Sequence, residues 1–233
     1  MGGCLNVIGE HKSIRRYKPD PVPEEDLEKI LEAARRHPSS WNLQPVTVFV
    51  VKEQEVKERL ASILWNQPHI REAPVFLIFA VDYLKVVRAT ELLGVEPVEP
   101  GQGNLLSGVM AASMSLAWAA LAAESLGYGV AFIAVYGRPC RVAEALKLPR
   151  YLLPIAGLLI GKPAESPGLR PRQPVEALVS STDYGDPDAR AKSYMSNDPE
   201  LAKTLKMVMS KNGFYGEVNK EVAECLRRQG FRV

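Results

Sequence analysis

The sequence predicts one α+β domain followed by a helical tail. Short runs of β-branched and aromatic residues alternate with segments whose apolar residues recur at helical spacing. After Asp183 the composition turns polar and helical. At 233 residues, with 46% hydrophobic and 24% charged residues, the chain has the balance of an ordinary globular protein.

The first half of the chain alternates between helices and strands. In the first helix Leu27, Ile30 and Ala34 share one face, acidic residues occupy the first turn, and Pro38 ends the pattern. The run around Phe76 to Val81 is apolar without alternation, which indicates a strand buried on both faces. The expected elements are helix 24–37, strand 46–51, helix 55–65 and strand 74–82.

The second half begins with a loop rich in Gly, Pro and acidic residues at 95–103. A long helix follows and ends at Gly127, because glycine commonly closes a helix. Asp198, Pro199 and Glu200 have the order of a cap, a first-turn proline and an acidic first-turn residue. The expected elements are strand 130–135, helix 138–146, strand 153–161, a helix from Asp198 to about Met209 and a last helix near 217–229.

The stretch from Leu105 to Ala123 has no charged residue and approaches the length that crosses a bilayer. It is rich in alanine and serine, and it has no flanking Lys or Arg anchors. A helix of this kind also suits the centre of a domain or a subunit interface. We therefore expect a core helix and no association with a membrane.

The net charge of +2 offers no global field that would attract nucleic acid or anionic lipid. Cys4, Cys140 and Cys225 are odd in number and far apart in the sequence. This pattern, with no signal-like N-terminal segment, favours a cytoplasmic protein without disulfide bonds.

Protein-based hydrolytic chemistry has little support in the sequence. The three histidines, His11, His37 and His69, are not at metal-ligand spacing, and no nucleophile-elbow motif occurs. Gly101-Gln102-Gly103 lacks the third glycine and the preceding strand of a dinucleotide-binding loop. Chemistry supplied by a bound cofactor is therefore favoured.

Two basic stretches suggest an anionic ligand. His11-Lys12-Ser13-Ile14-Arg15-Arg16-Tyr17 lies near the N-terminus, and Leu169-Arg170-Pro171-Arg172 lies far downstream. Arginine holds phosphate oxygens two at a time, so both clusters suit one phosphate. Taken alone, Arg15 and Arg16 are better explained as solvated surface charges, and Arg170 and Arg172 around Pro171 suit a plain surface turn.

The order of several motifs resembles the FMN-dependent nitroreductase and flavin reductase family, particularly its NADPH-preferring branch. The motifs are the first basic stretch, Pro38-Ser39-Ser40-Trp41-Asn42-Leu43-Gln44-Pro45, Glu124-Ser125-Leu126-Gly127-Tyr128-Gly129, and the block from Leu153-Pro154 through Gly161-Lys162-Pro163 to Arg170-Pro171-Arg172. The resemblance covers about residues 5–180. It implies a three-layer fold with a central, mostly antiparallel sheet flanked by helices, and a homodimer with FMN at the subunit interface.

The resemblance also assigns roles to individual residues. It implies that His11, Ser13, Arg170 and Arg172 hold the FMN phosphate, that Lys12 reaches the ribityl or phosphate oxygens, and that Arg15 lies beside the pyrimidine edge of the flavin. Further FMN contacts are implied for Ser39, Ser40 and Asn42 from the other subunit, for Gln67, and for Phe132, Ile133, Ala134 and Val135 along the ring. Trp41 is expected to line the substrate pocket, although a half-buried loop tryptophan explains it as well. Ala134-Val135 replaces a pair of glycines that this branch often has.

The implied activity is transfer of electrons from NADPH or NADH, through FMN, to nitroaromatics, quinones or free flavin, with no catalytic side chain and no metal. A protein that stores or senses FMN without turnover is the alternative, and a cofactor-free interaction domain is a third interpretation. We expect residues 1–183 to form the FMN-binding domain and residues 184–233 to form a helical extension of it.

Overall fold

The computed structural model describes residues 3–232, which form two compact units. The first unit contains the residues up to Pro167 together with Lys220 onwards, and the second contains Gly168–Asn219. The divisions between these units, after Pro167 and after Asn219, differ from the boundary at residue 183 that the sequence suggests. That boundary stays a prediction.

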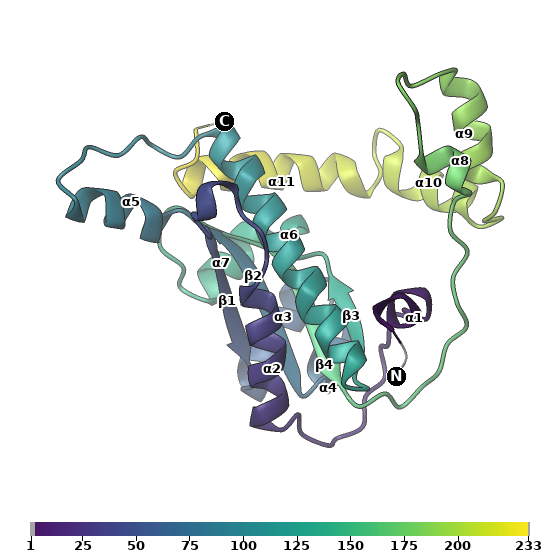
Figure 1. Cartoon of the computed structure of the whole chain (residues 1–233), viewed down its shortest axis with the longest axis horizontal. Helices are drawn as coiled ribbons and strands as arrows, with labels where there is room; N and C mark the ends of the chain where they lie inside the picture. Colours follow the sequence, from purple (N-terminus) through teal and green to yellow (C-terminus); the bar gives the residue numbers. More distant parts are fainter. Residues whose placement is uncertain (1–2, 233) are drawn as a thin grey trace. The chain divides into compact units, whose positions relative to one another are not determined.

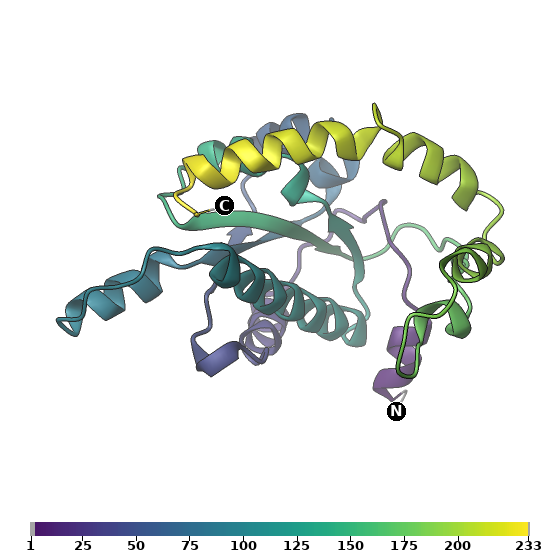
Figure 2. The same ribbon diagram turned by 90° about the horizontal axis from the view of Figure 1, so that it is seen from above.

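The first unit is built on a four-stranded sheet in the order β1-β2-β4-β3, with every neighbouring pair antiparallel. Helices cover both faces of the sheet, with α2 and α6 on one face and α3, α4 and α7 on the other (Figures 1 and 2). The predicted three-layer α+β fold with an antiparallel sheet is confirmed. The bounds of its elements are α1 Cys4–Gly9, α2 Glu24–Arg35, β1 Val46–Val51, α3 Gln54–Ile63, α4 Pro68–Glu72, β2 Val75–Asp82, α5 Leu84–Leu92, α6 Gln102–Ser125, β3 Gly129–Ile133, α7 Pro139–Ala145 and β4 Leu152–Gly161, with short 3-10 turns at Ser40–Asn42 and Val135–Gly137.

The second unit is helical and contains α8 (Val175–Leu178), α9 (Pro187–Met195) and α10 (Leu201–Met209). The last helix, α11, runs from Phe214 to Arg228, and its residues from Lys220 onwards belong to the first unit. Most predicted elements agree with the structure to within a few residues, whereas α1, α4, α5, α8 and α9 have no counterpart in the sequence prediction. The expected cap at Asp198 lies in a turn instead, where its carboxylate accepts the Glu200 N–H at 3.0 Å before α10 begins.

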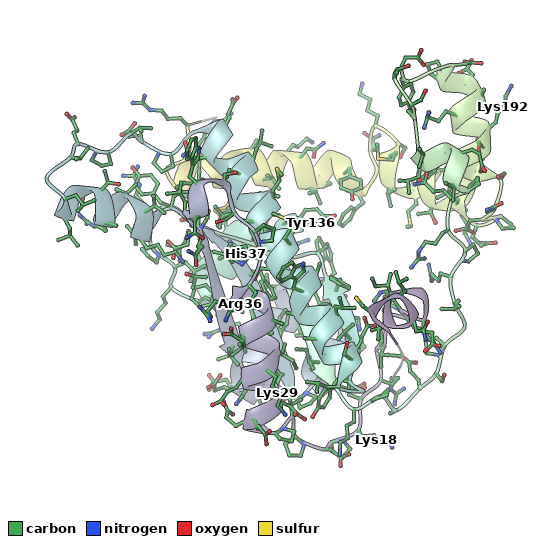
Figure 3. All side chains as sticks on the ribbon, viewed as in Figure 1. Lys18, Lys29, Arg36, His37, Tyr136 and Lys192 are labelled. Atoms are coloured by element: carbon green, nitrogen blue, oxygen red, sulfur yellow. A yellow bond between two sulfur atoms is a disulfide. The ribbon has the colours of Figure 1, made fainter. Side chains whose placement is uncertain are left out.

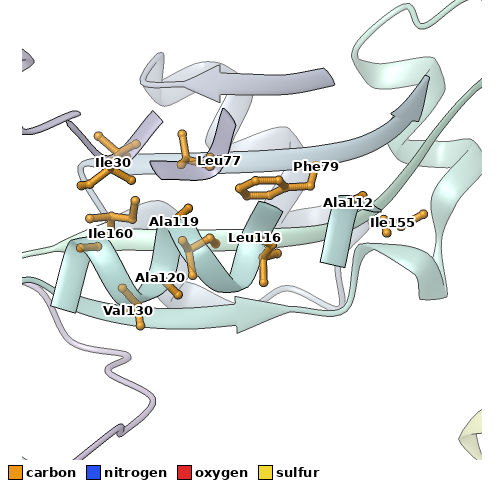
Figure 4. Close-up of a cluster of buried hydrophobic side chains, with 14 of the residues drawn as sticks. Ile30, Leu77, Phe79, Ala112, Leu116, Ala119, Ala120, Val130, Ile155 and Ile160 are labelled. Carbon is orange, nitrogen blue, oxygen red and sulfur yellow. The ribbon is translucent and has the colours of Figure 1, made fainter. Parts of the chain in front are cut away.

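Strand β2 is fully buried, as its unbroken apolar sequence predicts. Alternate residues point to opposite faces, so Leu77 and Phe79 pack toward α2 and α6 while Phe76 and Ile78 pack toward α3 and α4. Figure 4 shows the first of these clusters, in which Leu116 lies over the sheet. The sheet is therefore a rigid platform with a packed core on each side.

Helix α6 is long and apolar enough to cross a membrane by length and composition, and no other helix in residues 3–232 meets that criterion. Its inner face is packed on the sheet through Gly108, Ala112, Ser115, Ala119 and related small residues. The expectation of a core helix is therefore confirmed for this face. The opposite face is exposed in the single chain, because Leu106, Met110 and Trp118 have 67%, 63% and 42% of their surface accessible.

The expectation that the chain has no disulfide is wrong. Cys140 in α7 and Cys225 in α11 form a disulfide with their Cα atoms 5.3 Å apart, and Cys4 is free. The two residues are 85 positions apart, so only the folded arrangement of α7 and α11 shows that they meet. A cytoplasmic location stays a prediction, since disulfides also occur in intracellular proteins of hyperthermophiles.

We predict that Cys225→Ser lowers the free energy of unfolding by about 3 kcal/mol, because the disulfide closes a long loop in the unfolded chain. Urea unfolding under non-reducing conditions measures this loss, with Cys4→Ser as the control that changes nothing. Thiol titration of the denatured wild-type protein should find one free thiol per chain before reduction and all three cysteines after it. Three free thiols without reductant would contradict the pairing.

Candidate functional site

The basic stretch near the N-terminus lies as an extended strip between β3 and the segment that follows β4. The Ile14 N–H donates to the Val130 carbonyl at 2.8 Å, and the Lys18 N–H donates to the Lys162 carbonyl at 2.9 Å. Ile14 and Tyr17 are buried, and the Tyr17 hydroxyl donates to the Ile14 carbonyl at 2.6 Å. Burial raises the pKa of Tyr17 above its ordinary value, so this donor stays protonated. These anchors leave His11, Lys12 and Ser13 partly exposed and Arg15 exposed.

Arg15 lies in this strip with its backbone fixed and its side chain exposed. One oxygen of Glu165 accepts the backbone N–H groups of Arg15 at 2.5 Å and of Arg16 at 3.2 Å. The Arg16 guanidinium is 3.2 Å from the Glu72 carboxylate, whereas no carboxylate pairs with the Arg15 guanidinium within residues 3–232. The fixed backbone therefore presents the Arg15 cation toward solvent, where an anionic or electron-rich ligand edge would meet it.

The end of β3 offers backbone donors. The last strand pair joins Ile133 to Gly157, and from Ala134 onward the chain leaves the sheet to form the turn Val135–Gly137. In the described part of the chain, neither the Ala134 nor the Val135 N–H donates to a backbone carbonyl. Ile133 and Val135 have 3% and 0% of their surface accessible, so both face the core, and Ala134 between them is partly exposed. Phe132 differs, because 45% of its surface is exposed.

Gln67 lies in a tight turn beside this segment. Its side-chain amide donates to the Leu64 carbonyl at 2.9 Å, and the two residues before it, Trp65 and Asn66, have φ angles of 58° and 56°. The Trp65 ring covers Gly137 so closely that a Cβ at that glycine would clash with it. This contact brings the Gln67 turn and the end of β3 to the same region.

His69 in α4 is a buried neighbour of Arg15 that the sequence did not single out for the site. Burial and, after it, the positive charge of Arg15 lower the pKa of the His69 imidazole. The strip, the Gln67 turn, α4 and the end of β3 therefore bring together His11, Lys12, Ser13, Arg15, Gln67, Phe132, Ile133, Ala134 and Val135.

The loop with Ser39, Ser40, Trp41 and Asn42 lies elsewhere along the same chain. It follows the end of α2, where the Ser115 hydroxyl of α6 donates to the Ala34 carbonyl at 3.0 Å. Figure 3 shows His37 at this end of α2 beside α6. His11 instead contacts Glu124 at the end of α6, roughly 13 Å further along the helix at about 1.5 Å per residue. One chain therefore does not bring this loop to the basic strip.

The loop itself has an unusual backbone. Trp41, Asn42 and Gln44 have φ angles of 55°, 56° and 48°, a region that residues other than glycine seldom adopt. The Ser39 hydroxyl accepts the Gln44 N–H at 3.0 Å, and the Gln44 side chain donates to Asn42. Trp41 is 94% exposed, so the half-buried alternative for this residue is wrong in the single chain.

Arg170 and Arg172 are exposed and belong to the second compact unit. The Arg172 guanidinium donates to the backbone carbonyls of Arg170 and Pro171 at 3.4 and 3.3 Å. Their place at an FMN phosphate stays a prediction.

Two carboxylates of the site, Glu124 and Glu165, were not assigned a role by sequence reasoning. Glu124 gives a signal, because it is the first charge after a long uncharged helix. Glu165 has no such signal in the sequence, since its partners Arg15 and Arg16 lie about 150 positions away.

We predict that Arg15→Gln raises the pKa of His69, because one of the two causes that lower it is removed while burial remains. In the wild type the unfolded chain takes up the His69 proton more readily, so stability is lost as the pH falls from about 6.5 toward the lowered value. The variant should lose less stability over that range. Titration of the imidazole protons by NMR measures the shift, and Arg59→Gln on α3 is the matched control. An unchanged His69 titration would place Arg15 away from α4.

Comparisons of the sequence and of the structure with known proteins identify related proteins that agree with one another. Residues 8–162 match the model of the Nitroreductase family. A Bacillus subtilis protein named FMN reductase, NAD(P)H, is 34% identical over 100% of this chain and 99% of its own length. An oxygen-insensitive NADPH nitroreductase from Salmonella typhimurium is 32% identical over 79% of this chain and 75% of its own. The solved structure of the hypothetical oxidoreductase YcnD from Bacillus subtilis superposes with a TM-score of 0.88 at 33% identity, covering 100% of this chain and 99% of that one.

Proposed function

The chain belongs to the nitroreductase family, and we propose that it is an FMN-dependent oxidoreductase that passes electrons from NADPH or NADH to small oxidants such as nitroaromatics, quinones or free flavin. The relatives that match most of its length are named for FMN reduction and for NADPH-dependent nitroreduction. These names and the site geometry support the same activity.

The observation that carries the proposal is the placement of the basic strip beside unused backbone donors. His11, Lys12 and Ser13 offer an imidazole, an ammonium and a hydroxyl along one extended segment, and a phosphate with a charge of about −1.5 to −2 is a suitable acceptor for all three. Arg15 and the Gln67 amide suit the polar edge of an isoalloxazine ring. The N–H of the partly exposed Ala134 donates to no backbone carbonyl of the described residues and suits the ring's heteroatoms. The donor set in the first unit therefore fits FMN.

When bound, FMN supplies the redox chemistry, because the flavin accepts a hydride from NAD(P)H and returns electrons to an oxidant. The protein binds and orients the ring, and the Arg15 cation favours the reduced, more negative form. Ala134 would donate through its backbone N–H, which any residue other than proline provides, so the absence of a glycine pair does not remove this donor. No side chain is required as an acid or base.

We further propose a homodimer in which each FMN site takes residues from both chains. The exposed face of α6, with Leu106, Met110 and Trp118, is apolar enough to bind a second copy. The buried Nε2 of His37 has no hydrogen-bond partner among residues 3–232, and it lies by a cavity of about 270 Å³ next to the Ser39–Asn42 loop. A twofold partner along α6 would carry this loop to the other chain's basic strip.

We predict that protein purified with FMN shows the visible absorbance of bound flavin and that NADPH or NADH bleaches it under anaerobic conditions. Addition of a quinone or a nitroaromatic compound should restore the absorbance over repeated cycles. Spectrophotometric titration with each donor and then with a panel of oxidants measures this. Flavin that binds but is not bleached would favour storage or sensing, and no flavin binding at all would favour a cofactor-free interaction domain.

We predict that inactive chains complement each other if the site is shared. A mixed dimer of one His11→Ala chain and one Asn42→Ala chain has one site with both substitutions and one with neither, so it should recover about half of the wild-type flavin content. Differently tagged chains, co-expressed and purified in tandem, provide the mixed dimer, and each homodimeric variant is the control. A mixed dimer with no more flavin than the two homodimers would show that each site lies within one chain.

A further inference from the structure

A carboxylate lies directly beside a residue expected to hold a phosphate. Nδ1 of His11 is 2.7 Å from Oε1 of Glu124, which is the penultimate residue of α6. The pairing joins residues 113 positions apart, and the side chains retain only 25% and 16% of their exposure. A negative charge at this place would oppose the binding of a phosphate unless it serves the histidine.

The contact fixes which ring nitrogen of His11 is available. With Nδ1 bound to the carboxylate, only Nε2 remains for a ligand. The Phe132 ring meets the imidazole edge-on with the ring centroids 5.7 Å apart, so the ring plane is held as well. Glu124 and Phe132 together therefore orient His11 from α6 and from β3.

The surroundings make the histidine the natural partner of Glu124. Burial raises the pKa of the Glu124 carboxyl, and the hydrogen bond from His11 opposes this rise. A cavity of about 260 Å³ beside Glu124 is also lined by Glu10, Lys12 and Glu165. Three carboxylates against one ammonium group would repel a phosphate from this cavity. A phosphate is therefore expected on the Nε2 side of His11, outside the cavity, and Lys12 reaches it only by turning its ammonium group out of the cavity.

We infer that Glu124 is a positioning residue for FMN, which holds His11 with Nε2–H directed at the phosphate and compensates the charge of the imidazolium. The inference rests on the proposed function, because it concerns how this chain binds FMN. Glu124 itself touches no part of the ligand. It acts by accepting Nδ1–H and stabilising the doubly protonated ring, whose second proton lies on Nε2 and is donated to the phosphate.

The phosphate group allows the role to be tested separately from the rest of the flavin. Glu124→Gln keeps the size of the side chain and an oxygen acceptor but removes the charge. We expect the Kd for FMN to rise about tenfold, the typical contribution of a charge-assisted hydrogen bond, while the Kd for riboflavin changes less than about twofold. Fluorescence quenching of each flavin on titration with apoprotein measures both constants. Glu10→Gln is the matched control, because it removes another carboxylate of the same cavity and should weaken the binding of neither flavin.

Coupling to the histidine provides the second measurement. In a His11→Ala background, Glu124→Gln should no longer weaken FMN binding, since the residue through which the carboxylate favours the phosphate is gone and only its repulsion remains. Long-range nitrogen–proton correlation spectra of the wild-type apoprotein should show His11 protonated at Nδ1. With three histidines in the chain, single substitutions assign these signals.

Equal losses of FMN and riboflavin affinity in Glu124→Gln would mean a merely structural role and would overturn the inference. So would additive effects in the double variant, or a His11 protonated only at Nε2. If Glu124→Gln does not fold, the spectra of the wild type still decide the orientation of His11. Wild-type protein that binds riboflavin and FMN equally would overturn this inference alone, whereas protein that binds neither flavin would overturn the proposed function.

Discussion

The close packing of α6 against the sheet is the constraint on which the rest of the structure depends. A Cβ atom at Gly108 would lie 2.5 Å from a methyl group of Val81, so the helix approaches the strand as closely as glycine allows. Ala112, Ser115 and Ala119 continue this small-residue face along the helix. The approach sets the position of everything attached to α6. Ser115 holds the end of α2 and its loop, while Glu124 holds His11, so the helix fixes how far apart the two parts of the proposed site are.

The charges of the site follow a consistent division. Glu165 accepts hydrogen bonds from the backbone N–H groups of Arg15 and Arg16, and Glu124 bonds to Nδ1 of His11. The outward positions are left to groups that donate, which are the Arg15 guanidinium and Nε2 of His11. These partly exposed carboxylates thus orient the donors without neutralising them on the ligand side. Binding a phosphate then requires little rearrangement, and preorganisation of this kind is an inexpensive route to affinity.

Sequence reasoning succeeded where local pattern determines structure. The unbroken apolar run of β2 predicted a buried strand, and the small-residue character of α6 predicted a core helix. Both are found, because the tendency of each side chain to be buried can be read from its own residue type. It failed where partners lie far apart in the chain. Cys140 and Cys225, or Arg15 and Glu165, have no local signature, since only the finished fold brings them together. The order of motifs predicted the residues of the basic strip, but not the carboxylates that orient them.

Backbone strain supports the proposal that two chains complete the site. Trp41-Asn42 and Trp65-Asn66 are both in the left-handed region, which costs about 1–3 kcal/mol per residue and persists only where neighbours enforce it. The second pair has such neighbours within its own chain, because Arg71 donates to Asn66 at 2.6 Å and the Arg138 guanidinium lies 5.2 Å from the centre of the Trp65 ring. Within residues 3–232, the hydrogen bonds that hold the first pair lie inside its own loop, and its tryptophan is 94% exposed. This strained loop carries an exposed aromatic ring and lies next to the buried Nε2 of His37, which has no partner among residues 3–232. A second copy of the chain is the simplest source of the neighbours that both features lack.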